Sequence, residues 1–395
     1  MTGLTEIRNG RVVTPTEVID DGRVVLIDDR IADVSETGRT SLPRSKTIDA
    51  DGRVVMPGLV DLHGDDIEQH LYPRSNARVD VRQALSMADR VNVLTGVTTK
   101  FHAIAFEDSP DDGRTFADAN ELAREVATAT DCLGDNRLHA RCELSEASVD
   151  AVERVRSDVD VDLVSVMHHA PGDGQFDRDE FERHYVEDRN WPTERVAEAA
   201  AERELLSASD RESLSARIAG LAATAGVPLA SHDDETPADV DRMLGHGASI
   251  SEYPLTHDAA GHATERGMTT AMGAPNLVRG GSLWDNLSVR SAIDDGLVDV
   301  LCSDYHPPSL LTAPFVDTGE PLPVRINRVT RNPAEAVGLH DRGRIEVGAR
   351  ADVLLVDPDP VPTVERVFVE GTESLTASPE TPRRTRTPIT RGPGS

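Results

Sequence analysis

Eight short apolar runs alternate with helix-like segments through the middle of the chain, and this alternation limits the possible folds more than any other feature. Each run is rich in aliphatic residues, which predicts a strand buried on both faces. Such strands, separated by helices, form parallel βα units, and eight units can close into a (β/α)₈ barrel of the α/β class. The runs span residues 58–63, 96–103, 138–144, 161–169, 227–232, 248–254, 268–275 and 298–304.

The two ends of the chain carry a different pattern. Residues 1–55 read as short alternating strands joined by Asn-Gly and Asp-Gly turns, and residues 345–371 have the same character. We therefore expect the two ends to form one small β-sandwich domain, with the barrel of residues 56–344 inserted between them. Residues 372–395 are rich in Pro, Thr and Arg without an apolar period, which predicts a disordered tail.

The charge of the chain is strongly negative and restricts its partners. The formal net charge is −29, and among the 41 Lys and Arg residues only Lys46 and Lys100 are lysines. Such a composition is typical of halophilic proteins, because salt screens the self-repulsion of an acidic surface. It argues against nucleic-acid and anionic-membrane partners, which need a basic face. The charge is compatible with a homo-oligomer.

The cysteines and the first residues favour a cytoplasmic protein. Cys132, Cys142 and Cys302 form no CxxC pair and no even framework, so neither a disulfide scaffold nor a zinc finger is indicated. The first residues lack the charged and apolar regions of a signal peptide, and no run reaches the roughly 18 apolar residues of a membrane helix.

Metal-ligand side chains recur at the ends of the predicted strands. His63 and Asp65 share one face at the end of the first barrel strand, because successive side chains alternate across a strand. His169, His232 and Asp304 end three later strands, at the edge where barrel enzymes build their sites. A lone His-x-Asp pair is common by chance, and it is the recurrence that predicts a metal site.

A further carboxylate could bridge two ions. Glu143 shares a strand face with His139 and Arg141, so it is either a bridging ligand, with those residues in support, or an ion-pair partner of Arg141. Lys100 is a rival bridge if carboxylated, but we prefer Glu143. We expect two divalent ions, with zinc, manganese and iron all open, and Asp304 as the catalytic group that orients a water or accepts its proton.

A glycine-rich segment follows the seventh predicted strand. In residues 273–282, Asn276 and Arg279 lie beside consecutive glycines, so backbone amides, an amide side chain and a guanidinium could converge on phosphate oxygens. The alternative is a flexible barrel loop without a ligand.

Several blocks of this sequence together resemble the amidohydrolase superfamily, over nearly the whole chain. Within it they resemble the enzymes of the carbon-phosphorus lyase pathway that release pyrophosphate from a ribose 5-triphosphate. The blocks are PGLVDLHGDD, HHAPGDGQF, ASHDDET, SEYPLT, MGAPNLVRGGS, LCSDYHPPSLL and GARADVLLVD.

This resemblance implies a small phosphorylated sugar as substrate and a functional link to the other enzymes of that pathway. It implies that Asp233, Asp234 and Glu252 order the site or approach a metal. Gln69, His168 and Gly174 depart from the family pattern, which could change the substrate preference. The phosphate or sugar contacts that it implies are Arg74, Gln175, Asn276, Arg279, Ser282 and Asn286.

Two other functions fit the same features. A cyclic-amide hydrolase or nucleobase deaminase would use the same kind of metal site, and a carboxylated Lys100 would favour it. A metal-free, inactive scaffold that kept only the barrel is the alternative outside enzymes, and the full set of ligand types argues against it.

Overall fold

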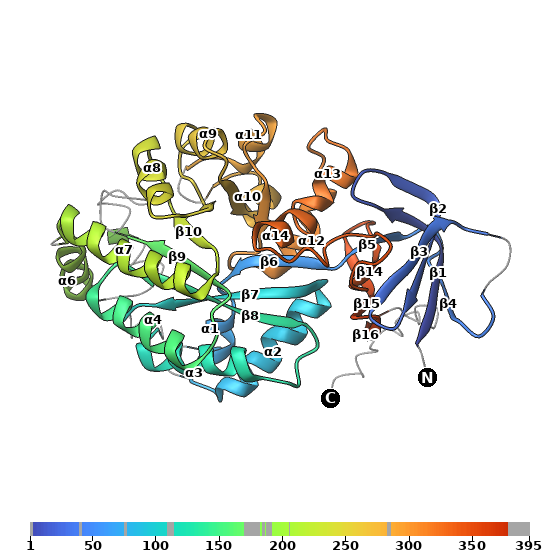
Figure 1. The fold of residues 1–395 in the computed structure, drawn as a ribbon, viewed down its shortest axis with the longest axis horizontal. Helices are drawn as coiled ribbons and strands as arrows, with labels where there is room; N and C mark the ends of the chain where they lie inside the picture. Colours follow the sequence, from blue (N-terminus) through green and yellow to red (C-terminus); the bar gives the residue numbers. More distant parts are fainter. Residues whose placement is uncertain are drawn as a thin grey trace, which may run out of the picture.

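The computed structural model describes residues 3–38, 42–74, 77–108, 114–169, 182–183, 186, 192–204, 206–282 and 286–377. Its centre is a nearly closed barrel of eight parallel strands, each paired with the next along the chain (Figure 1). Each of the eight predicted runs overlaps one of these strands, so the predicted barrel is confirmed. The barrel strands are β6 (Leu59–Gly64), β7 (Val97–Phe106), β8 (Asp135–Glu143), β9 (Leu163–Met167), β10 (Leu229–His232), β11 (Ile250–Glu252), β12 (Thr269–Gly273) and β13 (Val300–Cys302).

The barrel closes between its last and first strands at their carboxyl ends. Gly64 and Asp304 form a parallel bridge there. The backbone N–H of Asp304 donates to the carbonyl of His63 at 2.9 Å, and the N–H of Asp65 donates to the carbonyl of Asp304 at 3.1 Å. The closure therefore sets Asp304 beside the His63–Asp65 pair, although about 240 residues separate them.

Helices cover the outside of the barrel with aliphatic faces. Many begin after a Ser, Thr or Asp whose side chain accepts a backbone N–H of the first turn, as Ser145 and Thr236 do. Within the described ranges, no helix is long and apolar enough to cross a bilayer. The helices are α1 (Ile67–Leu71), α2 (Val81–Leu94), α3 (Phe116–Thr128), α4 (Glu146–Asp158), α6 (Thr193–Glu204), α7 (Ala208–Ala225), α8 (Pro237–Gly245), α9 (His257–Glu265), α10 (Ala274–Arg279), α11 (Val289–Asp294), α12 (Pro307–Thr312), α13 (Leu322–Asn327) and α14 (Arg331–Ala336).

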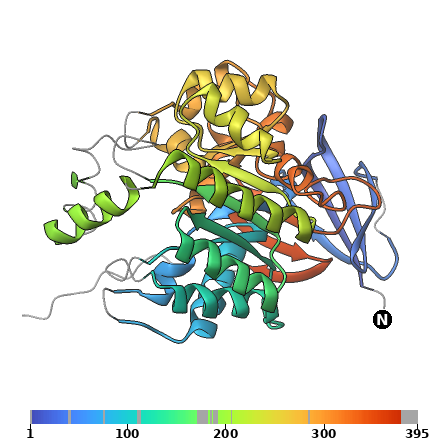
Figure 2. The ribbon, with the colours of Figure 1, turned by 60° about the vertical axis from the view of Figure 1, so that its left-hand side comes forward.

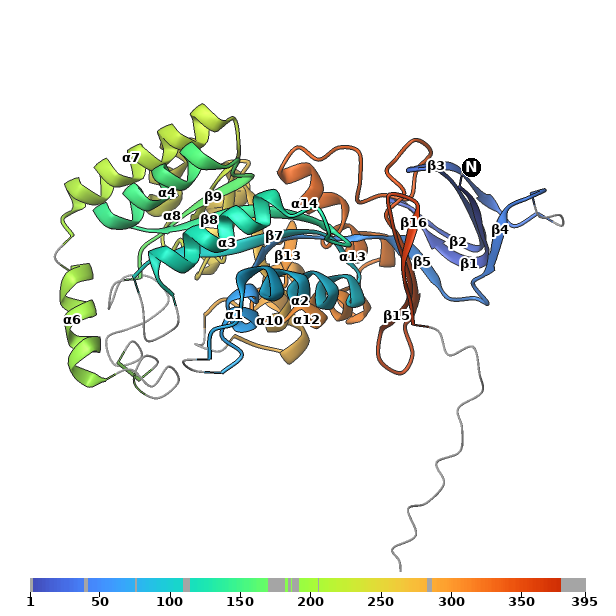
Figure 3. The same ribbon diagram turned by 90° about the horizontal axis from the view of Figure 1, so that it is seen from below.

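Both ends of the chain build one separate eight-stranded sheet, which lies at one side of the barrel (Figure 2). Its order is β16-β15-β14-β5-β1-β2-β3, with β4 paired to β1. Figure 3 shows the C-terminal strands between the barrel and the N-terminal strands. The strands are β1 (Leu4–Val13), β2 (Val18–Ile27), β3 (Arg30–Glu36), β4 (Lys46–Asp49), β5 (Val54–Pro57), β14 (Val353–Asp357), β15 (Thr363–Val369) and β16 (Thr372–Thr376).

One expectation about the C-terminal segment is corrected. Residues 372–376 were expected in the tail, but they form β16 and pair antiparallel with β15, as Val369 with Thr372 shows. The tight turn before β16 uses left-handed backbone at Glu370 and Gly371, and a Cβ at Gly371 would lie 1.7 Å from the carbonyl oxygen of Asp28. The rest of the expected tail, residues 378–395, lies outside the described residues.

Candidate functional site

Imidazole and carboxylate side chains gather at the carboxyl ends of the barrel strands. His63 lies on β6, Glu143 ends β8, and His232 ends β10. Glu252 ends β11, and Asp304 follows β13 directly after Ser303. Because the strands are parallel, their ends meet at one rim of the barrel, and residues far apart in the sequence become neighbours.

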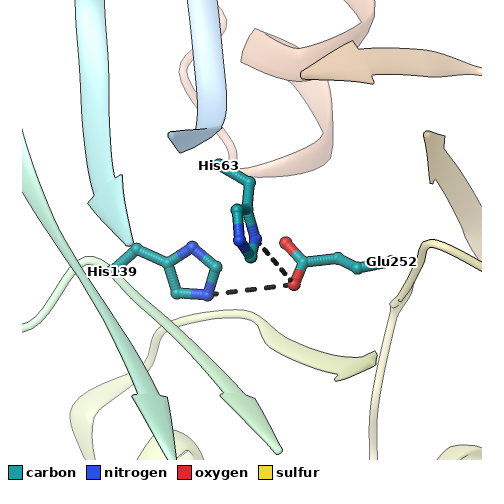
Figure 4. A group of neighbouring side chains, drawn as sticks. All are labelled: His63, His139 and Glu252. Atoms are coloured by element: carbon teal, nitrogen blue, oxygen red, sulfur yellow. Dashed lines mark hydrogen bonds and ion pairs between the residues drawn. The ribbon is translucent and has the colours of Figure 1, made fainter. Parts of the chain in front are cut away.

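Glu252 is the centre of one group of side chains (Figure 4). Its Oε2 lies 3.2 Å from Nδ1 of His63, 3.4 Å from Nδ1 of His232 and 4.0 Å from Nε2 of His139. Burial alone would raise the pKa of Glu252, but the histidines outweigh it and hold the pKa well below its usual value. Among the described residues, no hydrogen-bond partner lies at Oε1 of this buried carboxylate, so one oxygen is available to a ligand.

His139 contacts this group but is held by other residues. Its Nδ1 lies 3.0 Å from the carbonyl of Leu62, and its Nε2 lies 2.8 Å from Oγ of Ser165. Burial lowers the pKa of His139 to about 3, so the ring is neutral. With both nitrogens engaged, His139 is better suited to orienting Glu252 and the backbone before His63 than to binding an ion.

A second group surrounds His169. Its Nδ1 lies 2.7 Å from Oε2 of Glu143, and its Nε2 lies 3.2 Å from Oδ2 of Asp233. Burial works to lower the pKa of His169, but the charges of Glu143 and Asp233 outweigh it and raise the pKa to about 9. His169, His232 and Asp233 can present one ligand atom each within 4.8 Å of one another, as can His63, His139 and Glu252.

Two carboxylates border the groups on the side where the barrel closes. Burial raises the pKa of Asp304 to about 8, and the neighbouring Asp65 carboxylate adds to the shift. Oδ2 of Asp65 lies 3.2 Å from Nη1 of Arg141 and 3.4 Å from Nη2 of Arg114. These two guanidinium groups are the cations nearest Asp65 among the described residues.

Strained backbone marks the same rim. Asp233, Tyr253 and Asp304 have φ of 58°, 55° and 56°, and each directly follows or nearly follows a barrel strand. Left-handed backbone is tolerated by Asp but is uncommon for a bulky residue such as Tyr253. Its ring packs edge-on against His63, with 5.0 Å between centroids. Strain of this kind concentrates at functional sites, where the surroundings hold it in place.

The donor set fits divalent cations. Five carboxylates, of Asp65, Glu143, Asp233, Glu252 and Asp304, share a buried to half-buried rim with the imidazoles of His63, His169 and His232. Repulsion from Asp65 helps to keep a proton on Asp304, and a bound cation would relieve this repulsion. Mixed imidazole and carboxylate oxygen donors suit zinc, manganese or iron.

The six metal-ligand residues predicted from the sequence all lie at this rim. His63, Glu143, His169 and His232 belong to the two groups, while Asp304 lies at the barrel closure and Asp65 is paired with arginines at their edge. The sequence predicted that Glu252 and Asp233 order the site or approach a metal and that His139 has a supporting role, and all three fall within the candidate groups. The signal was present, because Glu252 ends a barrel strand and Asp233 directly follows His232.

Lys100, the rival bridging ligand, has other partners. Its Nζ lies 2.7 Å from Oδ2 of Asp61 and 2.9 Å from Oδ1 of Asp66. Burial works to lower the pKa of Lys100, but these carboxylates outweigh it and raise the pKa. A protonated amine cannot form a carbamate, so the structure favours Glu143 over a carboxylated Lys100.

The residues expected to contact phosphate or sugar are more exposed than the predicted metal ligands. Arg74 and Arg279 are exposed, Ser282 and Asn286 are half-buried, and Gln175 lies outside the described residues. The predicted glycine-rich loop is corrected, since much of it forms the short helix α10.

Asn276, within that helix, has a structural role in the neighbouring loop. It donates to the carbonyl of Leu287 at 3.3 Å and accepts from the N–H of Val289 at 3.1 Å. A phosphate contact at Asn276 would have to replace or share these bonds, so its predicted role remains a prediction.

Comparison with known proteins connects this site to a family. No family model matches the chain. The chain is 35% identical over 364 residues to the alpha-D-ribose 1-methylphosphonate 5-triphosphate diphosphatase of Escherichia coli K12, covering 88% of this chain and 94% of that protein.

Solved structures of low sequence identity share the fold. The ochratoxinase of Aspergillus niger, at 15% identity, has a TM-score of 0.64 and matches 94% of this chain and 96% of its own. The N-acetyl-D-glucosamine-6-phosphate deacetylase of Mycobacterium smegmatis, at 16% identity, has a TM-score of 0.61 and matches 94% of this chain and 100% of its own. The solved structures share the fold, and the E. coli relative shows that the chain belongs to the alpha-D-ribose 1-methylphosphonate 5-triphosphate diphosphatase family.

Proposed function

We propose that this enzyme hydrolyses alpha-D-ribose 1-methylphosphonate 5-triphosphate to the 5-phosphate and pyrophosphate in phosphonate catabolism. The observation that carries the proposal is the 35% identity to the E. coli diphosphatase over 88% of the chain, joined to a rim of ligand-type residues. The reaction breaks the phosphoanhydride bond between the α and β phosphorus atoms, with water adding to the α phosphorus and pyrophosphate leaving.

Divalent ions would complete the site. We propose two ions held by residues drawn from His63, Asp65, Glu143, His169, His232 and Asp304, with Asp233 and Glu252 as additional ligand candidates. When bound, such ions activate water and offset the charge of phosphoryl oxygens. Asp304 would orient the attacking water and accept its proton, because cations at the rim would displace the proton that Asp304 carries in the metal-free protein and leave an ionised carboxylate.

Arg114 and Arg141 supply the fixed positive charge that a polyanionic substrate needs. Both guanidinium groups are mostly buried and converge on Asp65 from different elements, β8 for Arg141 and the segment before α3 for Arg114. We propose that they bind phosphoryl oxygens beside the metal centre, where low exposure strengthens the attraction. This role adds to the contacts at Arg74 and Arg279 proposed from the sequence.

Replacing Arg141 with glutamine (R141Q) is expected to lower kcat/KM for the triphosphate by about 10- to 100-fold, the loss typical of a hydrogen bond to a charged group. Inhibition by pyrophosphate should weaken to a similar extent, while the metal content stays unchanged. R82Q is the matched control, since Arg82 is 69% exposed on α2. An R141Q enzyme that loses metal but binds pyrophosphate normally would show that Arg141 only organises Asp65.

The proposed activity is tested by phosphorus NMR of the metal-loaded enzyme at molar salt. The ribose methylphosphonate triphosphate should yield pyrophosphate and the 5-phosphate, and ATP should be turned over more slowly. A cyclic amide serves as the third substrate. Orthophosphate as the first product from both triphosphates, or opening of the cyclic amide without turnover of either triphosphate, would refute the proposal.

A further inference from the structure

A buried ammonium group lies at the closure of the barrel, bonded to a residue of β6 and to the residue after β13. Lys100 lies on β7 and is 2% exposed. Its Nζ is 2.7 Å from Oδ2 of Asp61, 2.9 Å from Oδ1 of Asp66 and 3.0 Å from Oγ of Ser303. These three partners come from β6, from the residues just after it, and from the end of β13. One side chain therefore connects the second barrel strand to both strands that meet at the closure.

The partners of Lys100 bond in turn to the backbone that carries ligand candidates. Oδ1 of Asp61 accepts from the N–H of His63 at 3.3 Å and from the N–H of Ser303 at 3.0 Å. The Oγ of Ser303 also donates to Oδ2 of Asp61 at 2.5 Å. Asp304 is the next residue along the chain. The network thus fixes the backbone at His63 on one strand relative to the backbone before Asp304 on the other.

The space around the ammonium group explains why this position is a lysine. The chain has only two lysines among its 41 Lys and Arg residues, so arginine is its usual cation. A Cβ built on Gly64 would lie 1.8 Å from Nζ of Lys100 and 2.7 Å from its Cε, which shows that the amine fills the place of that side chain. A compact ammonium fits between three acceptors here, whereas a planar guanidinium needs more room.

We propose that Lys100 is a positioning residue of the metal centre: with Asp61 and Ser303 it sets the distance between the His63 and Asp304 ligands across the barrel closure. The proposal rests on the metal centre of the proposed function but not on the identity of the substrate. Groups that orient ligands from behind determine metal affinity and geometry, although they do not contact the ion.

The test is a titration of metal-free enzyme with Co²⁺ at molar salt, followed by visible absorption, which reports the ligand geometry. Lys100→Met should bind Co²⁺ about 10- to 100-fold more weakly than wild type and give a changed d–d spectrum. Lys100→Arg should not restore the wild-type spectrum. Lys46→Met is the matched control, since Lys46 is 55% exposed and pairs with Glu373 in the small sheet; it should match wild type.

Ser303→Ala keeps the experiment decisive if the Lys100 variants do not fold. It removes one partner of the ammonium group without leaving a buried charge unpaired. We therefore expect a smaller loss of Co²⁺ affinity and a smaller spectral change than in Lys100→Met. Wild-type Co²⁺ affinity and spectrum in folded Lys100→Met, or in Ser303→Ala when the former does not fold, would overturn the proposal. A wild-type enzyme that binds Co²⁺ but cleaves no triphosphate would refute the proposed function alone.

Discussion

Replacing Asp304 with asparagine (D304N) is expected to lower kcat by about 10²- to 10⁴-fold, the range for loss of a general base. Asparagine keeps the size of the side chain and can still hydrogen-bond to a water, but it cannot accept a proton. A cation bound at the rim would displace the proton that Asp304 carries in the metal-free protein, which leaves a carboxylate able to accept a proton from water. Steady-state kinetics on the triphosphate would measure the loss.

The pH dependence of metal binding identifies how Asp304 acts. In the metal-free protein the pKa of Asp304 is about 8 and that of His169 about 9, so both groups carry protons at neutral pH. A cation that uses them must displace these protons, and its affinity therefore rises with pH. Each displaced proton contributes about a tenfold rise per pH unit below the pKa of its group. Metal binding to D304N should displace one proton fewer, so the metal affinity of this variant should rise less steeply with pH than that of wild type.

Two outcomes would contradict this role. One is a D304N enzyme with near-normal kcat. The other is a D304N enzyme whose Co²⁺ affinity keeps the full pH dependence of wild type. D299N is a suitable control, because Asp299 lies before β13 at its opposite end and bonds to Thr270 rather than to the rim. It should leave both kcat and the pH dependence almost unchanged.

The barrel and most of its rim could be predicted from the sequence, because both depend on local patterns. Aliphatic runs define the strands, and parallel strands place their ends together whatever the loops do. A histidine such as His169 or His232 at the end of a run is therefore placed at the rim by the fold alone. The same reasoning places Asp304 at this rim, whereas its hydrogen bond to His63 becomes evident only from the closure of the barrel.

The partners of each rim residue depend on side-chain geometry that strand patterns do not contain. The contact between His63 and Glu252 joins residues 189 apart in the sequence. It depends on neighbouring groups, such as His139, that have no metal-binding pattern of their own. Arg114 likewise reaches Asp65 from the segment before α3, and nothing in its local sequence indicates that direction.

The error at residues 273–282 has a different cause. Consecutive glycines suggested a loop, but Pro275 lies in the first turn of α10, and Gly280 ends the helix with φ of 86°. Proline at the start and glycine just past the end are typical helix boundaries. The signal for a short helix was therefore present, and the loop interpretation gave too much weight to the glycines.

Gly64 provides the second large effect, because it leaves room for the buried ammonium group. In Gly64→Ala, the new Cβ would lie 1.8 Å from Nζ of Lys100 and 2.6 Å from Oγ of Ser303. A lysine end is normally flexible, but this one is held by Asp61 and Asp66 in a buried site. Displacing it breaks a buried ion pair, so we expect a loss of about 3–5 kcal/mol in the free energy of unfolding.

Denaturant unfolding of Gly64→Ala beside Gly220→Ala would measure this loss. Gly220 lies within α7, and a Cβ there meets no atom within 4 Å, so the control should gain up to about 1 kcal/mol from helix propensity. A double-mutant cycle with Lys100→Met then isolates the mechanism. If the clash acts through the ammonium group, Gly64→Ala should cost much less in the Lys100→Met background than in wild type. Equal costs in the two backgrounds would instead assign the effect to the clash with Oγ of Ser303 or to the backbone between His63 and Asp65.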